Sequence, residues 1–192
     1  MNVTAHGHVT IRDKESGEIL LDRDNAIHYG NMSAAIVRAL AGDSTGFVRY
    51  VAFGNGASSV QSDGTIIYAE PNVNETYDTQ AQLYSETYRK DVLNSGPNNY
   101  VEFVTNANSD LRVIVTLSAG EPSDLDMDAN GVNYTAQQTS DLISDFDGDY
   151  VFDEIALMDS DGIMLSHVRF HPVLKSANRI IEIEYTVRIQ MA

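Results

Sequence analysis

The chain has 192 residues, 43% of them hydrophobic, and carries 12 basic against 28 acidic side chains, for a formal net charge of −16. This composition is typical of a folded globular protein, and the charge makes nucleic acid and anionic membrane surfaces poor partners. The absence of cysteine excludes disulfides, zinc–thiolate sites and thiol catalysis.

The first residues, Met1–His6, lack the basic start and the apolar run of a signal peptide. No apolar stretch of the sequence approaches the length that a membrane span needs. We therefore expect a protein that is made in the cytoplasm, has no membrane partner and stays soluble until it assembles.

The N-terminal segments predict a β-hairpin followed by a helix. Apolar residues alternate over 7–11, a polar turn follows at 13–17, and residues 18–21 return as a second strand. Residues 22–31 are polar and irregular. Ser33 can cap a helix over about 33–41, with Gly42 just past its end. The apolar stripe of this helix needs a sheet to lie against and consists of Ile36, Val37 and Leu40.

The middle of the chain is less regular. Residues 47–53 carry apolar side chains on both faces, which is typical of a central, doubly covered strand. The loop 54–59 holds a Gly-x-Gly pattern without the third glycine and helix of a nucleotide fingerprint. Residues 83–92 fit either a short helix or an edge strand. Residues 100–105 and 111–117 then predict a strand pair.

The C-terminal third has the clearest pattern. Residues 152–158 and 163–170 flank the polar turn 159–162, which predicts a hairpin. From 181 to 189, apolar residues occupy every second position, as in a strand with one buried face. The fold class we expect is mainly β: a single antiparallel β-sandwich domain over 1–192, with one packed helix and an acidic loop insertion at 118–149.

Two acidic runs within the insertion are the only candidates for a metal site, with calcium as the expected ion. They are Asp124, Asp126 and Asp128, and Asp145, Asp147 and Asp149. The first run has Ala129 where a calcium loop has glycine, and Thr135 where it has a bidentate glutamate. A solvated acidic loop is the alternative, and we expect no other cofactor.

No arrangement in the sequence predicts catalysis. His6 and His8 share a strand face, as do His167 and His171, but two ligands are only half of a metal site. No serine lies in a G-x-S-x-G elbow. We therefore assign no catalytic residue and expect a protein without enzymatic activity.

Two parts of the sequence resemble structural proteins of tailed-phage virions. The first runs from 22–28 through the helix to the strand and loop at 51–56; the second joins 152–158, 170–175 and the alternating strand at 181–189. The resemblance covers about half of the chain. It implies a virion component in several copies, located in the neck, tail or baseplate or attaching fibres, and it carries over no catalytic residue.

This resemblance implies that the partners are other virion proteins and copies of the chain itself, so that the protein is located in the virion. Loops and unpaired strand edges would supply the contacts. The interface candidates are Asn25, His28, Tyr29, Asn55 and Asn98. Two alternatives stay open: a decoration protein on the capsid surface, and a carbohydrate-binding β-sandwich assisted by calcium.

Overall fold

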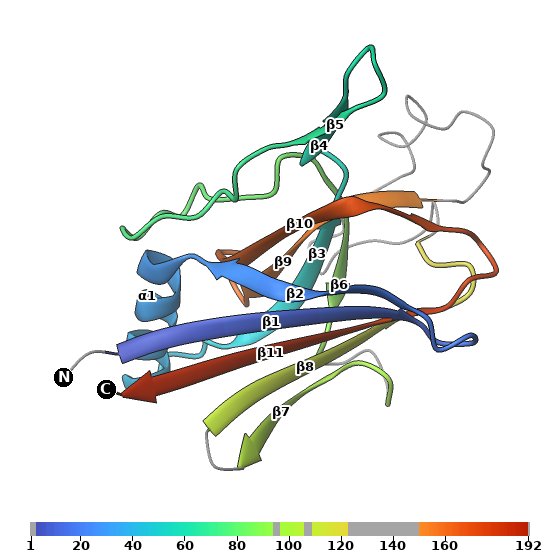
Figure 1. The fold of residues 1–192 in the computed structure, drawn as a ribbon. Helices are drawn as coiled ribbons and strands as arrows, with labels where there is room; N and C mark the ends of the chain where they lie inside the picture. The colour runs from blue at the N-terminus through green and yellow to red at the C-terminus, as the bar shows by residue number, and fades with distance from the viewer. Residues whose placement is uncertain (1–2, 94–96, 106–108, 123–149, 192) are drawn as a thin grey trace.

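The computed structural model describes residues 3–93, 97–105, 109–122 and 150–191. Its main element is an antiparallel sheet of nine strands in the order β6-β3-β9-β10-β2-β1-β11-β8-β7 (Figure 1). The strands are β1 (Val3–Asp13), β2 (Ile19–Ile27), β3 (Val48–Gly54), β6 (Glu86–Asp91), β7 (Tyr100–Thr105), β8 (Ser109–Leu117), β9 (Tyr150–Asp159), β10 (Met164–Lys175) and β11 (Ile181–Met191). A separate small sheet pairs β4 (Ser58–Val60) with β5 (Ile66–Tyr68), and one helix, α1, spans Tyr29–Leu40.

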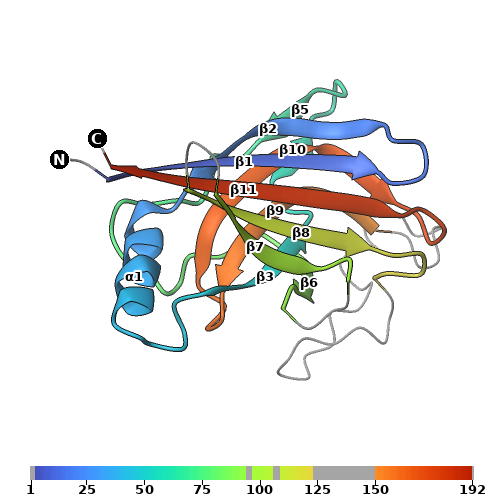
Figure 2. The same ribbon diagram turned by 90° about the horizontal axis from the view of Figure 1, so that it is seen from below.

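The large sheet folds over because strand β2 belongs to both of its halves. Up to Asn25, β2 pairs with β1, and its last two residues, Ala26 and Ile27, pair with β10. One layer is therefore formed by β2, β1, β11, β8 and β7, and it lies against the layer formed by β10, β9, β3 and β6 (Figure 2). The mainly β, antiparallel fold class predicted from the sequence is confirmed.

The core lies between the two layers. Alternate residues of β1 and β11, such as Val9 and Tyr185, are completely buried and meet Phe53 and Phe152 of the opposite layer in one apolar cluster. The rings of Phe53 and Phe152 have their centroids 5.1 Å apart. This apolar interior supplies the main driving force for folding, because burial of apolar area is favourable roughly in proportion to that area.

Helix α1 closes one end of the sandwich, beside the start of β1 and the end of β11 (Figure 1). It starts four residues earlier than the sequence predicts, because the side chain of His28, not Ser33, accepts the N–H of Asn31 and caps it. Gly42 lies past its end with φ of 74°, as expected. The predicted apolar stripe is confirmed only at Ile36, which packs against the core. Val37 and Leu40 are exposed, and the buried apolar residues of the helix are Met32 and Ala35.

The predicted hairpins at 152–170 and 100–117 are confirmed as β9–β10 and β7–β8. Two other predictions need correction or refinement. The segment 22–27 is not irregular, because β2 continues through it. The ambiguity at 83–92 resolves to β6, an edge strand paired with β3.

Most of the predicted acidic insertion lies outside the described residues, which include only 118–122 of it. The metal candidates Asp124, Asp126, Asp128, Asp145, Asp147 and Asp149 all lie outside them as well. Among the residues that are described, no helix is both long and apolar enough to cross a membrane.

Candidate interaction site

The segment between β3 and β6, residues 55–85, leaves the sheet and returns to it; we call it the excursion. It carries β4 and β5, which belong to neither layer (Figure 1) but contact β10, since Arg169 donates to the carbonyl oxygen of Tyr68. Its return path covers the side of β3, β9 and β10 that faces away from the core. A small apolar cluster fills this contact and consists of Tyr50, Ala52, Ala81, Leu83, Ala156, Met158 and Met164.

Glu154 of β9 is the centre of the polar attachment of the excursion. Its side chain is fully buried. Oε1 accepts the backbone N–H groups of Ser85 at 2.8 Å and Gly56 at 3.2 Å, and Oε2 accepts that of Tyr84 at 3.0 Å. Burial alone would raise the pKa of Glu154, but the hydrogen bonds from His167, Ser85 and Tyr84 outweigh it, so the pKa lies below its usual value.

His167 of β10 extends this network. Its Nε2 lies 3.0 Å from Oε2 of Glu154, and its Nδ1 accepts the backbone N–H of Asn72 at 2.9 Å. Because Nδ1 is an acceptor, the ring carries its proton on Nε2 and donates it to Glu154. The ring of Tyr84 lies 5.8 Å from the imidazole, centroid to centroid. One buried imidazole thus joins the excursion to the sheet at two places, Asn72 and Tyr84.

Asp153 holds the beginning of the excursion. Its carboxylate accepts the backbone N–H groups of Ala57 at 3.1 Å and Ser58 at 2.8 Å, and the hydroxyl of Ser58 at 2.5 Å. Burial raises the pKa of Asp153 despite these hydrogen bonds. The two adjacent acidic residues of β9 therefore bind backbone N–H groups at both ends of the excursion, at 56–58 and at 84–85.

Asn31 joins the excursion to helix α1 and to β10. Its Oδ1 accepts the N–H of Asp78 at 2.8 Å, while its Nδ2 donates to the carbonyl oxygens of Asp78 at 2.8 Å and Met164 at 2.9 Å. Asn31 is 1% exposed. Helix, excursion and sheet are consequently held together by one amide whose hydrogen bonds are all internal.

Large apolar side chains are exposed on this firmly held framework. On the excursion, Val60 is 70% exposed and Ile67 is 50% exposed; on α1, Val37 and Leu40 are 65% and 83% exposed. Outside this framework, Phe103 of the edge strand β7 is 66% exposed. Single exposed apolar residues are ordinary on protein surfaces, whereas contiguous apolar patches mark contact surfaces.

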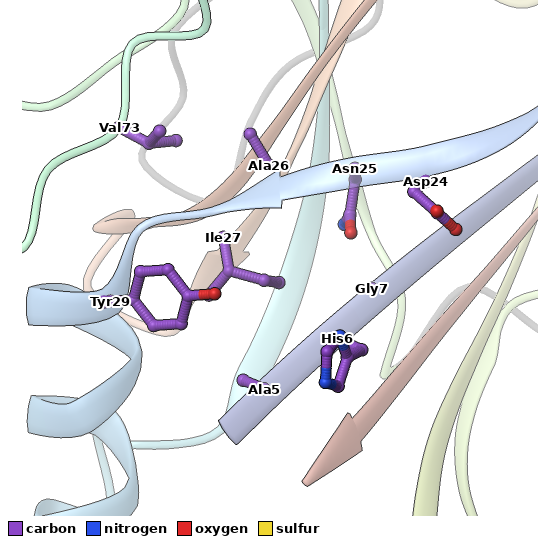
Figure 3. A pocket seen from close by; sticks show the side chains of 9 residues that line it. All are labelled: Ala5, His6, Gly7, Asp24, Asn25, Ala26, Ile27, Tyr29 and Val73. Carbon is purple, nitrogen blue, oxygen red and sulfur yellow. The ribbon is translucent and has the colours of Figure 1, made fainter. Parts of the chain in front are cut away.

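A cavity of about 290 Å³ lies where β1 and β2 separate, next to the start of α1 (Figure 3). The side chain of Asn25 lies over Gly7, where a Cβ atom would come within 1.7 Å of Asn25 Oδ1. Both polar atoms of the Asn25 side chain are buried, with no hydrogen-bond partner among the described residues. Glycine is therefore required at position 7, because any larger side chain would clash with the side-chain amide of Asn25.

The structure brings two of the predicted interface residues together, since Asn25 and Tyr29 both line this cavity. His28 is buried and caps α1. The other two lie on separate segments: the N–H of Asn55 donates to the carbonyl of Ser85 at 3.1 Å, and Asn98 is exposed. Within the described residues, no group of three or more His, Asp or Glu side chains could hold a metal ion.

Sequence reasoning missed the attachment network. A usable signal was present, because Asp153 and Glu154 are two consecutive acidic residues inside an otherwise apolar strand. Buried carboxylates need hydrogen-bond donors, so the pair indicates donors from another segment. No family model, no curated protein and no solved structure matches this chain.

Proposed function

We propose that the chain is a non-enzymatic structural subunit of a tailed-phage virion, acting in the neck, tail or baseplate by binding other virion proteins and copies of itself. The sequence resemblance described above supports the virion assignment. The observation that carries the assembly role is the set of exposed apolar side chains on elements that buried polar contacts hold in place.

Helix α1 illustrates why this arrangement suits assembly. Asn31, Met32 and Ala35 anchor the helix, so Val37 and Leu40 are presented on a fixed support. These two residues are three positions apart and share a helix face. Burying a leucine side chain in a contact is worth about 1.5–3 kcal/mol, and a fixed support limits the entropy lost on binding.

The edge strand β7 offers a second type of contact. It pairs with β8 on one side and ends the sheet on the other. On that edge its backbone groups pair with no other described strand and can accept a strand from a neighbouring chain. The exposed ring of Phe103 would add apolar area to that contact.

The direct test is mass spectrometry of purified particles, with the copy number determined. We expect the protein in several copies per particle, and labelled-antibody microscopy should locate it on the neck, tail or baseplate. Signal on the capsid faces would instead identify a decoration protein. Absence from the particle would refute the proposal.

Leu40→Asp tests the contact surface itself. The exchange should leave folding unchanged, because Leu40 is 83% exposed, but it should lower incorporation into particles about tenfold, because a charge must then be buried in the contact. Ile19→Asp is the matched control, at a 58% exposed position on β2, and should be incorporated normally. Equal incorporation of both variants would exclude α1 from the interface.

A further inference from the structure

A second cavity, of about 360 Å³, is lined by Arg23, Tyr68, Arg169 and His171. We propose that it is a binding site for a carboxylate group. The inference does not depend on the proposed virion role, because it follows from the geometry and the charges of the cavity.

The cavity exists because β2 and β10 separate. The two strands pair only at Ala26–His167 and Ile27–Ser166, and Arg23 and Arg169 lie on either side of the opening beyond these pairs. Nη1 of Arg23 donates to the carbonyl oxygen of Arg169 at 2.8 Å and bridges the opening. This bond uses one of the five N–H groups of the Arg23 guanidinium.

Arg169 is fixed by the excursion. Its Nη1 donates to the carbonyl oxygens of Tyr68 and Ala69, so its guanidinium is held at the C-terminal end of β5. The hydroxyl of Tyr68 lies 3.5 Å from Nδ1 of His171. Two guanidinium groups, one imidazole and one phenol therefore converge on the same space.

The charges of these arginines are far less compensated than those of the others. Seven of the nine arginines form ion pairs at 2.7–3.9 Å with carboxylates that are at most 45% exposed: Arg12, Arg38, Arg49, Arg89, Arg112, Arg179 and Arg188. Among the described carboxylates, Arg169 forms an ion pair only with Glu70, at 3.5 Å, whose side chain is 89% exposed. Arg23 forms no ion pair with any described residue.

Nearby acidic groups do not cancel this positive charge. Asp24 lines an adjoining cavity, but its carboxylate pairs with His8 at 3.0 Å and is 91% exposed. More distant carboxylates are screened by salt beyond about 8 Å at physiological ionic strength. A protein of net charge −16 thus keeps a local cationic cavity, to which an anionic ligand is complementary in charge.

A carboxylate is the ligand that fits this set of donors. The planar fork of a guanidinium matches the two oxygens of a carboxylate, and Arg23 retains Nε–H and Nη2–H groups for it. The Tyr68 hydroxyl and the His171 ring can supply further hydrogen bonds.

The test is a titration of the full-length, ¹⁵N-labelled protein with glutarate, followed by NMR. We expect saturable shifts confined to residues 68–70 and 168–171, together with Arg23. Arg23→Gln should weaken binding at least about tenfold, because it removes a charge-assisted hydrogen bond. Arg12→Gln, the matched control on β1, makes the same change of charge and should bind glutarate as the unmodified protein does.

His171→Gln provides a second variant at an exposed position and should also weaken binding. Shifts that do not saturate, that spread over the surface, or that weaken equally in Arg23→Gln and Arg12→Gln would overturn the proposal. The acetylated, amidated peptide Gly-Glu-Gly serves as a further probe. Binding as tight as that of glutarate supports a side-chain carboxylate as the ligand, and binding of glutarate alone supports a free organic acid.

Discussion

Two histidine–carboxylate contacts in this molecule have the same chemistry and opposite surroundings. His167 and Glu154 are both 0% exposed and lie 3.0 Å apart. His8 lies 2.6 Å from Asp22 and 3.0 Å from Asp24, but its side chain is 46% exposed and theirs are 57% and 91% exposed. The buried contact also accepts backbone N–H groups from the excursion, whereas the surface contact joins only β1 and β2.

The difference shows that burial, rather than residue type, decides what such a contact contributes. A buried carboxylate that loses its partners carries the full penalty of desolvation, so the excursion and the sheet depend on each other. An exposed pair exchanges its partners with water at little cost. Substitutions in the buried contact should therefore lower the free energy of unfolding much more than substitutions in the exposed one.

The largest effect is expected for Glu154→Ala. The exchange leaves the ring of His167 and the N–H groups of Gly56, Tyr84 and Ser85 without their acceptor. We expect a loss of about 3–5 kcal/mol in the free energy of unfolding, measured by urea denaturation. Hydrogen exchange should show these three amides losing protection.

Glu75→Ala is the control for this prediction, because Glu75 is an exposed glutamate on the same excursion. Its free energy of unfolding should stay within about 0.5 kcal/mol of that of the unmodified protein. A loss below about 1 kcal/mol in Glu154→Ala would show that the excursion is attached by other means.

Lowering the pH should have an intermediate effect on the free energy of unfolding. The pKa of Glu154 is lowered from its ordinary value of 4.5, so its contribution to stability is complete above that value and is lost as the pH falls through the pKa of the folded state. Asp153 and Asp159, whose pKa values burial raises, act in the opposite sense.

Comparison of the unmodified protein with Glu154→Gln isolates the glutamate. The difference in free energy of unfolding, measured by urea denaturation at a series of pH values, should be largest near pH 7 and should shrink as the pH drops below 4.5. A difference that is independent of pH would contradict a charged Glu154 in the folded protein.

The smallest effect is expected for His8→Gln. Hydrogen bonds to Asp24 and Asp22 raise the pKa of His8 above 6.5, so its contribution is present below that value and fades as the pH rises through the folded-state pKa. Because the pair is exposed, the difference should be at most about 0.5 kcal/mol at pH 6 and should vanish by pH 9. Thermal unfolding at both pH values measures it, and a persistent difference at pH 9 would point to packing instead.

The sequence was informative where side chains alternate between core and solvent. The patterns at 152–170 and 181–189 predict strands because each exposes one face and buries the other, and the structure has strands there. The same patterns do not name the neighbour of a strand. β11 pairs with β1 and β8 rather than with the β9–β10 hairpin that precedes it. The alternation of apolar residues along β11 would be the same with either set of neighbours.

The candidate site was harder to predict, for two physical reasons. Glu154 and Asp153 bind mostly backbone N–H groups, which every residue except proline offers, so the partner segment leaves no mark in the sequence. Val37 and Leu40 were expected to face a sheet, because helical spacing shows that residues share a face but not whether that face is covered.

The pairing of β1 with β11, which matches Val3 with Met191 and Asp13 with Ile181, also has a consequence for synthesis. While the ribosome is still making the segment after residue 180, β1 and β8 each lack the strand that will separate them. A nascent chain at that stage exposes two strand edges that lack their partner, and these can pair with other chains. The β1–β11 pairing also forms slowly, because its two strands are far apart in the sequence. Premature termination products of this protein should therefore precipitate rather than accumulate as smaller folded fragments.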